Sequence, residues 1–151
     1  MSPDIVLRIG SSKVGTAIAA FPTILLADDN PSMLETIVDI LGKKYTVVAA
    51  LRNGASVLDQ IDALRPDLAI LDVSLGDMSG FEVARRLRDR GCPTKIMFLT
   101  VHEAIDFVSE AFNIGVSGYV FKSRVAEDLT KAIDVVINGG RFTSSTSLSS
   151  R

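Results

Sequence analysis

The sequence predicts an α/β protein in which five parallel strands form one doubly wound sheet and five helices cover it. Five short apolar runs alternate along the chain with five segments whose apolar residues recur at helical spacing. Most of the runs are apolar throughout, as is typical of strands buried on both faces. Because each crossover between parallel strands needs a helix, the alternation indicates helices on both faces of the sheet.

Length and composition are those of one ordinary globular domain. The chain has 151 residues, 47% of them hydrophobic and 23% charged, with a formal net charge of -2. This balance provides no basic surface for nucleic acid. No apolar run approaches the roughly 20 residues that span a membrane, and the single cysteine, Cys92, lies in a turn where an incidental thiol is favoured over a nucleophile. We therefore expect a cytoplasmic protein without an internal disulfide.

Residues 1–22 are an N-terminal extension or tail that precedes the regular pattern. Residues 4–9 could add an extra strand, and the glycine and serine residues after them have the composition of a flexible joint. The apolar stretch 17–27 resembles the core of a signal peptide, but Pro22 interrupts it and two aspartates follow it directly. A buried strand is the better interpretation of that stretch.

The five strands are predicted from short apolar runs bounded by turn residues. In chain order they are residues 23–27, 45–51, 68–71, 95–99 and 118–121. The second run is rich in valine and alanine. Each of the other four is followed by a polar or charged residue, which places that residue at the carboxyl end of a strand.

The five helices are predicted from apolar residues at helical spacing and from recognisable stop signals. They run from 31 to 41, from the turn at 53–54 to Pro66, from 81 to 90, from about 104 to 113 and from about 126 to 138. Gly42 and Gly115 stop the first and fourth helices, and the Gly139-Gly140 pair stops the fifth. Pro66 ends the second, because proline lacks a donor and restricts the residue before it.

Two further segments have a structural interpretation. Four arginines on the polar side of the third helix alternate with acidic residues, so a solvated face is favoured over a nucleic-acid or phosphate site; they are Arg85, Arg86, Arg88 and Arg90. Residues 141–151 are rich in serine and threonine and lack apolar periodicity, which predicts a linker or a disordered tail after a domain at 23–140.

Four strand ends carry side chains that are capable of chemistry. Asp28 and Asp29 follow the first strand, Asp72 the third, Thr100 the fourth and Lys122 the fifth. The carboxyl ends of parallel strands form the edge at which ligands bind to such sheets. Taken alone, Asp72 would be interpreted as a solvated loop residue, but the residues at the other strand ends favour a shared site.

Three carboxylates at one edge predict a metal ion, because they would otherwise repel and raise one another's pKa. All the ligands on offer are oxygens, which excludes a zinc site and favours Mg²⁺, an ion that keeps water and takes phosphate oxygens. With a lysine and a hydroxyl beside it, such a site suits phosphoryl transfer onto Asp72 as the nucleophile. No glycine-rich nucleotide loop is present, so a nucleotide is not implied.

These five positions, together with the segment Tyr119-Val120-Phe121-Lys122, resemble the receiver domain of response regulators in two-component systems over about residues 23–140. The resemblance implies a flavodoxin-like fold with strand order 2-1-3-4-5. It also implies that a histidine kinase or phosphotransfer protein phosphorylates Asp72. In the family, the threonine moves to bond the phosphoryl group and the aromatic residue of the fifth strand, here Tyr119, swings inward.

The resemblance further implies a ligand set and two tuning positions. Mg²⁺ would be held by Asp29, Asp72 and the backbone carbonyl of Ser74, with Asp28 assisting mainly through water. Ser74 and His102 lie two residues beyond Asp72 and Thr100, positions that in receivers influence how fast the phosphoryl group is hydrolysed. The chain departs from the family where Gly76 replaces the usual proline, which puts the stiffness of this loop in doubt.

The ending AIDVVINGGRF resembles receivers of the NarL/FixJ type, in which a DNA-binding helix-turn-helix domain follows. The chain stops where such a domain would begin, so it is either a single-domain regulator or lacks its effector. The expected function is a phosphorylation switch that controls transcription through that missing domain, with a homodimer as one possible assembly. We expect no enzymatic activity beyond self-phosphorylation and self-dephosphorylation.

Two alternatives remain from the residues. A Mg²⁺-dependent phosphohydrolase would use the same nucleophile, but such enzymes commonly place a second acid two residues on, where this chain has Ser74. A stand-alone receiver that acts only through protein contacts is the other.

Overall fold

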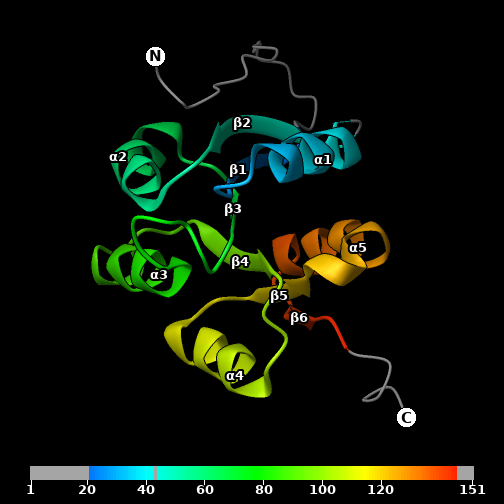
Figure 1. Ribbon diagram of the computed structural model, residues 1–151. Helices are drawn as coiled ribbons and strands as arrows, with labels where there is room; N and C mark the ends of the chain where they lie inside the picture. Colours follow the sequence, from blue (N-terminus) through cyan, green and yellow to red (C-terminus); the bar gives the residue numbers. More distant parts are fainter. Residues whose placement is uncertain (1–20, 43, 146–151) are drawn as a thin grey trace.

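The computed structural model describes residues 21–42 and 44–145, and its elements alternate as predicted (Figure 1). They are β1 Thr23–Ala27, α1 Pro31–Leu41, β2 Thr46–Leu51, α2 Gly54–Leu64, β3 Leu68–Leu71, α3 Gly80–Asp89, β4 Lys95–Thr100, α4 Ile105–Ile114, β5 Gly118–Phe121, η1 Lys122–Arg124, α5 Val125–Ile137 and β6 Phe142–Thr143. The predicted strands and helices are confirmed to within one residue at nearly every end. The extra strand expected at residues 4–9 lies outside the described residues.

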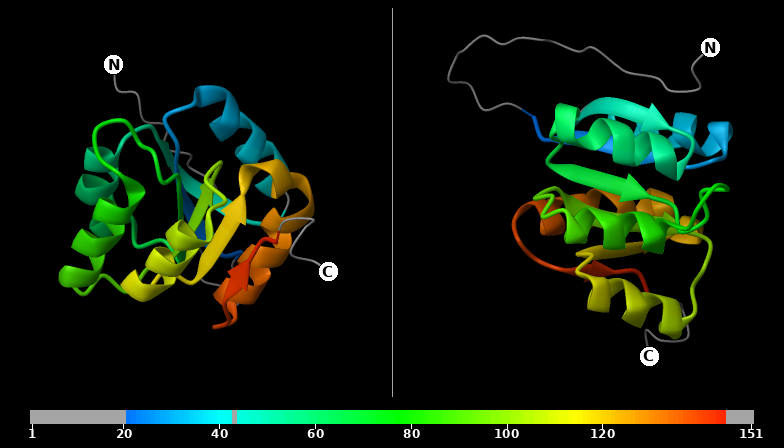
Figure 2. Two further views of the ribbon diagram at one scale, coloured as in Figure 1. Left: turned by 60° about the horizontal axis from the view of Figure 1, so that its bottom comes forward. Right: turned by 90° about the vertical axis from the view of Figure 1, so that its left-hand side faces the viewer.

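The strands form one sheet in the order β2-β1-β3-β4-β5-β6, and every neighbouring pair is parallel. The predicted order 2-1-3-4-5 is therefore confirmed, with one further strand at the β5 edge. Helices cover both faces, α1 and α5 on one and α2, α3 and α4 on the other (Figures 1 and 2).

Each face of the sheet has its own apolar core. Alternate side chains of β1 enter the two cores, Leu25 and Ala27 on the side of α2 and α3, Ile24 and Leu26 on the side of α1 and α5. Because successive side chains of a strand point to opposite faces, a strand that is covered on both sides must be apolar at every position. This explains why the strand runs show no polar alternation.

At the start of the segment 141–151, which is predicted as a linker or a disordered tail, Phe142 and Thr143 form the short strand β6 beside β5. This segment lacks an apolar pattern, and buried polar contacts hold it against the domain. The Ser144 hydroxyl donates to Asp128 in α5 at 2.7 Å and accepts from the Phe121 amide at 3.1 Å. A strand of only two residues shows no apolar alternation, so the sequence pattern could not predict β6. Its tertiary contacts define it.

The arginines of α3 have the structural role that their acidic neighbours predicted. Arg86 pairs with Glu82 on the same helix, Arg85 pairs with Glu110 of α4, and Arg90 pairs with Asp62 of α2. These pairs link the helices on one face of the sheet. Among the residues that the structure describes, no helix has the length and apolar character that crossing a bilayer requires.

Candidate functional site

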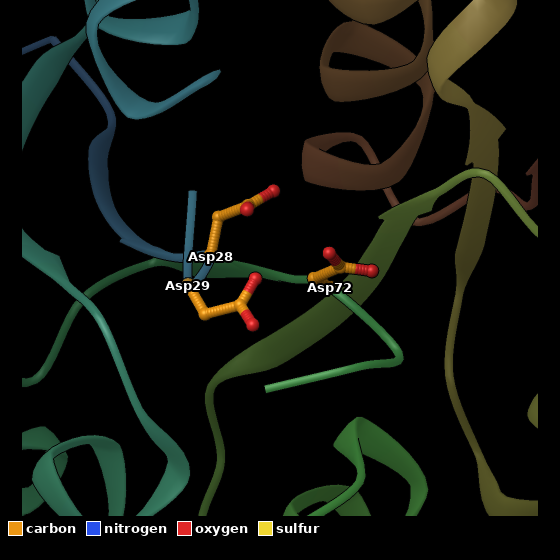
Figure 3. A group of neighbouring side chains, drawn as sticks. All are labelled: Asp28, Asp29 and Asp72. Atoms are coloured by element: carbon orange, nitrogen blue, oxygen red, sulfur yellow. The ribbon is translucent and has the colours of Figure 1, made fainter. Parts of the chain in front are cut away.

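The carboxyl ends of β1 and β3 bring three carboxylates together at one edge of the sheet. Asp28 and Asp29 follow β1, Asp72 follows β3, and each offers an oxygen that lies within 4.8 Å of the other two (Figure 3). The two strands are direct neighbours, with Ala27 in register with Leu71, so the residues after them necessarily meet. The predicted acidic cluster is therefore present, and it could hold a metal ion.

Lys122, which directly follows β5, reaches across β4 into this cluster. Its Nζ lies 2.7 Å from Asp28 Oδ2 and 2.9 Å from Asp72 Oδ2, so one ammonium group bridges two carboxylates. Both are almost completely buried, with 1% and 5% of their surface exposed, whereas Asp29 is exposed. The predicted positive charge is thus in contact with two of the three acids.

The charges in the cluster do not cancel. Burial raises the pKa of Asp28, and the nearby charge of Asp72 adds to this, although bonds from Lys122 and from the Asn30 amide oppose it. Burial by itself would lower the pKa of Lys122, but the hydrogen bonds that its ammonium group donates to Asp28 and Asp72 outweigh that effect and raise the pKa. Lys122 is therefore charged at neutral pH, and three carboxylates face one ammonium group. The excess negative charge and the oxygen donors fit a hard divalent cation.

The loop from Asp72 to Gly80 is folded tightly against the end of β3. Asp72 Oδ1 accepts from the Ser74 amide at 3.2 Å, and the Gly80 amide donates to the Val73 carbonyl at 2.6 Å. A side chain at Gly80 would place its Cβ 2.3 Å from the Asp72 carbonyl oxygen, so only glycine fits there. Gly76, where the family usually has proline, has φ +85°, a conformation that proline cannot adopt.

Thr100 and Tyr119 both contact the loop after β4 through the backbone of His102. Thr100 is fully buried, and its hydroxyl accepts from the His102 amide at 3.3 Å. The Tyr119 hydroxyl donates to the His102 carbonyl at 2.7 Å, and its ring lies fully buried beside Phe98 and Phe121. Burial, together with the charges of Asp72 and Glu103, raises the pKa of Tyr119, so this phenol stays protonated and remains a donor. The two predicted switch residues are therefore both hydrogen-bonded to the backbone of the same residue, His102.

The two predicted tuning residues face each other across the mouth of the site. Ser74 Oγ and His102 Nε2 are 3.3 Å apart, and the imidazole ring lies edge-on against Phe107 of α4. Both residues line a pocket that also includes Asp29 and Gly76. The exposed carboxylate of Asp29 therefore lies in the same pocket as these two side chains. The backbone carbonyl of Ser74 as a ligand stays a prediction.

The sequence pattern did not identify Asp77 of this loop as a residue that helps to hold the site in place. The Asp77 carboxylate accepts hydrogen bonds from the first two amides of α2, those of Gly54 and Ala55. In the sequence Asp77 is one of several polar residues in a turn. Its partners lie more than 20 positions earlier, so no local spacing could reveal the contact.

The chain matches a known protein family. The sequence model of the response regulator receiver domain matches residues 24–134. Among curated relatives, the positive alginate biosynthesis regulatory protein of Pseudomonas aeruginosa is 34% identical over 113 residues, which are 73% of this chain and 45% of that protein. The nitrate/nitrite response regulator protein NarL of Escherichia coli K12 is 32% identical, over 74% and 52%. The chain thus spans about half the length of these relatives.

Solved structures agree with this family. The signal receiver domain of the response regulator NarL from Mycobacterium tuberculosis superposes with a TM-score of 0.76 at 28% identity, over 80% of this chain and 99% of that one. A two-component response regulator of the LuxR family from Aurantimonas sp. has a TM-score of 0.79 at 28% identity, over 87% and 94%.

Proposed function

Because the chain belongs to the response regulator receiver domains, we propose that it is a phosphorylation switch in which Asp72 accepts the phosphoryl group. The observation that supports this most directly is the bridge from Lys122 to Asp28 and Asp72, at 2.7 and 2.9 Å, beside the exposed carboxylate of Asp29. Response regulators are signalling proteins, and their chemistry serves a change of state rather than the turnover of a substrate.

The proposed cofactor is Mg²⁺, held by Asp29, Asp72 and the carbonyl of Ser74, with Asp28 contributing mainly through water. The oxygen donors and the surplus of negative charge in the acidic cluster support it. When bound, the ion would neutralise charge on the oxygens of the transferring phosphoryl group.

The side chains of the site have separate roles in the proposed transfer. A carboxylate oxygen of Asp72 attacks the phosphorus of a phosphohistidine in a histidine kinase or phosphotransfer protein, and the bond from phosphorus to the imidazole nitrogen breaks. Lys122 keeps its proton and balances charge on the new acyl phosphate. Thr100 accepts from the His102 amide through its oxygen, so its own proton can be donated to a phosphoryl oxygen.

The proposed output passes through the loop after β4. If Thr100 moves toward the phosphoryl group, its bond to His102 changes, and Tyr119 is attached to the same residue. Val101 on this loop and Ile105 at the start of α4 are exposed apolar side chains that a partner could cover. The relative named transcriptional regulatory protein DesR, from Bacillus subtilis, supports transcription as the final output of the switch. The proposed route is a DNA-binding domain outside this chain.

A phosphodonor assay tests the proposal. The protein incubated with acetyl phosphate and Mg²⁺ is expected to gain one phosphoryl group in its intact mass, and the gain is expected to disappear with a chelator or with Asp72→Ala. Uptake by the Asp72→Ala variant would overturn the assignment. The alternative, a Mg²⁺-dependent phosphohydrolase, is not favoured, because Ser74 occupies the position of its second acid.

A further inference from the structure

The loop that carries Asp72 is attached through Asp77 to the start of α2. Asp77 Oδ1 accepts from the Gly54 amide at 2.8 Å, and Oδ2 accepts from the Ala55 amide at 2.9 Å. The next amide of α2, that of Ser56, donates to the Asn53 side chain at 2.8 Å. The first three amides of α2 therefore all have partners, and the loop supplies two of them.

Charge favours this attachment. The start of a helix presents unpaired amides and a partial positive charge, which suit a carboxylate. Burial alone would raise the pKa of Asp77, but the hydrogen bonds from Gly54 and Ala55 outweigh it and lower the pKa, so the carboxylate is charged at neutral pH.

Met78, the next residue of the loop, packs on the same turn of α2. A Cβ at Gly54 would lie 2.6 Å from Met78 Cγ and 2.9 Å from Val83 Cγ2. Glycine at the start of α2 therefore allows the loop to come this close. The attachment thus has two parts. The Asp77 carboxylate bonds to two amides of α2, and Met78 packs where Gly54 leaves room for it.

The loop needs support from another element, because the glycine in its middle leaves the backbone conformationally free. Gly76, directly before Asp77, has φ +85° and no side chain, and glycine loses more conformational freedom on ordering than any other residue. Between Asp72 and Gly80 the loop's own support consists of short contacts, such as the Ser74–Ser79 bridge and the bond from the Asp77 amide to the Leu75 carbonyl.

We propose that Asp77 is a positioning residue, whose bonds to the start of α2 hold the phosphoacceptor loop in the geometry that metal binding and phosphorylation of Asp72 require. The proposal rests on the proposed function, since it assigns Asp77 to the same site. The start of α2 becomes a remote support for the cluster, although none of its residues touches the reacting groups.

Substitutions at Asp77 test this with Mg²⁺ titrations and with rates of phosphorylation by acetyl phosphate. Asp77→Ala removes both acceptors, whereas Asp77→Asn keeps one oxygen. Asp59→Asn is the matched control, because it removes one exposed negative charge from α2 itself. In isothermal titration calorimetry we expect Asp77→Ala to bind Mg²⁺ more weakly, by at most about tenfold, because loss of a direct hydrogen-bond partner of a metal ligand costs at least that much and Asp77 acts on the ligands only through the loop. Asp77→Asn should lie between Asp77→Ala and the unmodified protein, and Asp59→Asn should match the latter.

The outcomes separate this proposal from the proposed function. If the unmodified protein neither binds Mg²⁺ nor takes up the phosphoryl group, the proposed function itself fails. If the unmodified protein does both, and Asp77→Ala equals it in Mg²⁺ affinity and rate while its Gly54 and Ala55 amide resonances have shifted, the positioning role is overturned. If Asp77→Ala does not fold, Asp77→Asn decides: a lower Mg²⁺ affinity supports the role, and an unchanged affinity overturns it.

Discussion

Asp28 shows how a single buried charge couples stability to function. Its carboxylate is 1% exposed and shares Lys122 with Asp72, so folding confines more negative than positive charge. The raised pKa means that the folded state binds a proton on this acid more tightly than the unfolded state does. Stability from this group is full below the ordinary pKa of 3.8 and is lost as pH rises through the higher pKa of the folded state.

The first prediction concerns Asp28→Asn, which keeps an oxygen for Lys122 but removes the charge. In a chelator, the variant should be more stable than the unmodified protein at pH 7, with a higher midpoint of urea unfolding, and the advantage should vanish below pH 4. Its affinity for Mg²⁺ should fall. Urea unfolding at the two pH values measures the difference; a variant that is less stable at pH 7 would contradict this account of the charge balance.

Tyr45 offers a second test, at alkaline pH. Its hydroxyl donates to Asp134 of α5 at 2.5 Å, and burial together with this bond raises its pKa above the ordinary value of 10.0. Its stabilising contribution is present below pH 10 and is lost as pH rises through the folded-state pKa. We expect Tyr45→Phe to cost about 1 kcal/mol at pH 8, the typical net value of a hydrogen bond. Chemical denaturation at pH 8 and pH 11 should show a smaller alkaline loss in the variant; equal losses would exclude Tyr45 as the cause.

At the scale of elements, β6 is held by backbone hydrogen bonds to β5 and by one side-chain hydroxyl group. The Ser144 amide donates to the Tyr119 carbonyl at 2.9 Å and the Phe142 amide to the Ser117 carbonyl at 3.1 Å, while Ser144 Oγ bonds to Asp128. Asp128 also accepts from Arg124, so the strand is joined to η1, which begins at Lys122. The end of the described chain is thus connected to the site through η1.

Ser144→Ala should therefore release β6. The buried carboxylate of Asp128 loses a donor, at a cost of about 1–3 kcal/mol, and the amides of residues 142 and 144 should exchange with deuterium faster. Ser145→Ala, at an exposed neighbouring position, is the control. Unchanged exchange at both amides would show that backbone pairing alone holds the strand.

The start of α3 gives a prediction about close packing. Gly80→Ala would drive a methyl group to 2.3 Å from the Asp72 carbonyl oxygen, whereas Gly91→Ala meets no atom within 4 Å and suffers only from its φ of +71°. We expect about 1 kcal/mol of destabilisation for Gly91→Ala and clearly more for Gly80→Ala, with slower phosphorylation. Equal unfolding midpoints for the two variants would contradict the close approach.

For the molecule as a whole, much of the architecture could be predicted because most strands here are apolar on both sides. The apolar runs of β1, β3 and β5 indicated buried strands, and the polar residues that follow them indicated the edge where Asp28, Asp72 and Lys122 meet. Two features lay beyond local pattern: β6, which rests on the contacts of Ser144, and the bonds of Asp77 to α2. Each depends on partners distant in sequence, and short-range periodicity carries no information about those.

Metal binding should be visible in the stability of the whole molecule. A ligand that binds only the folded state stabilises it by about 2.7 kcal/mol at one hundred times its dissociation constant. Mg²⁺ should therefore raise the midpoint of thermal unfolding, and Asp29→Asn should reduce that rise, because Asp29 is the exposed acid of the cluster. A midpoint that does not respond to Mg²⁺ would contradict the proposed metal site.

The most direct test locates the phosphoryl group itself. After reaction with acetyl phosphate and Mg²⁺, borohydride reduces an aspartyl phosphate to homoserine, and peptide mapping by mass spectrometry then identifies the modified residue. The account predicts homoserine at position 72 and at neither 28 nor 29. Modification at another aspartate, or none in a protein that binds Mg²⁺, would contradict the assignment of Asp72 as the phosphoacceptor.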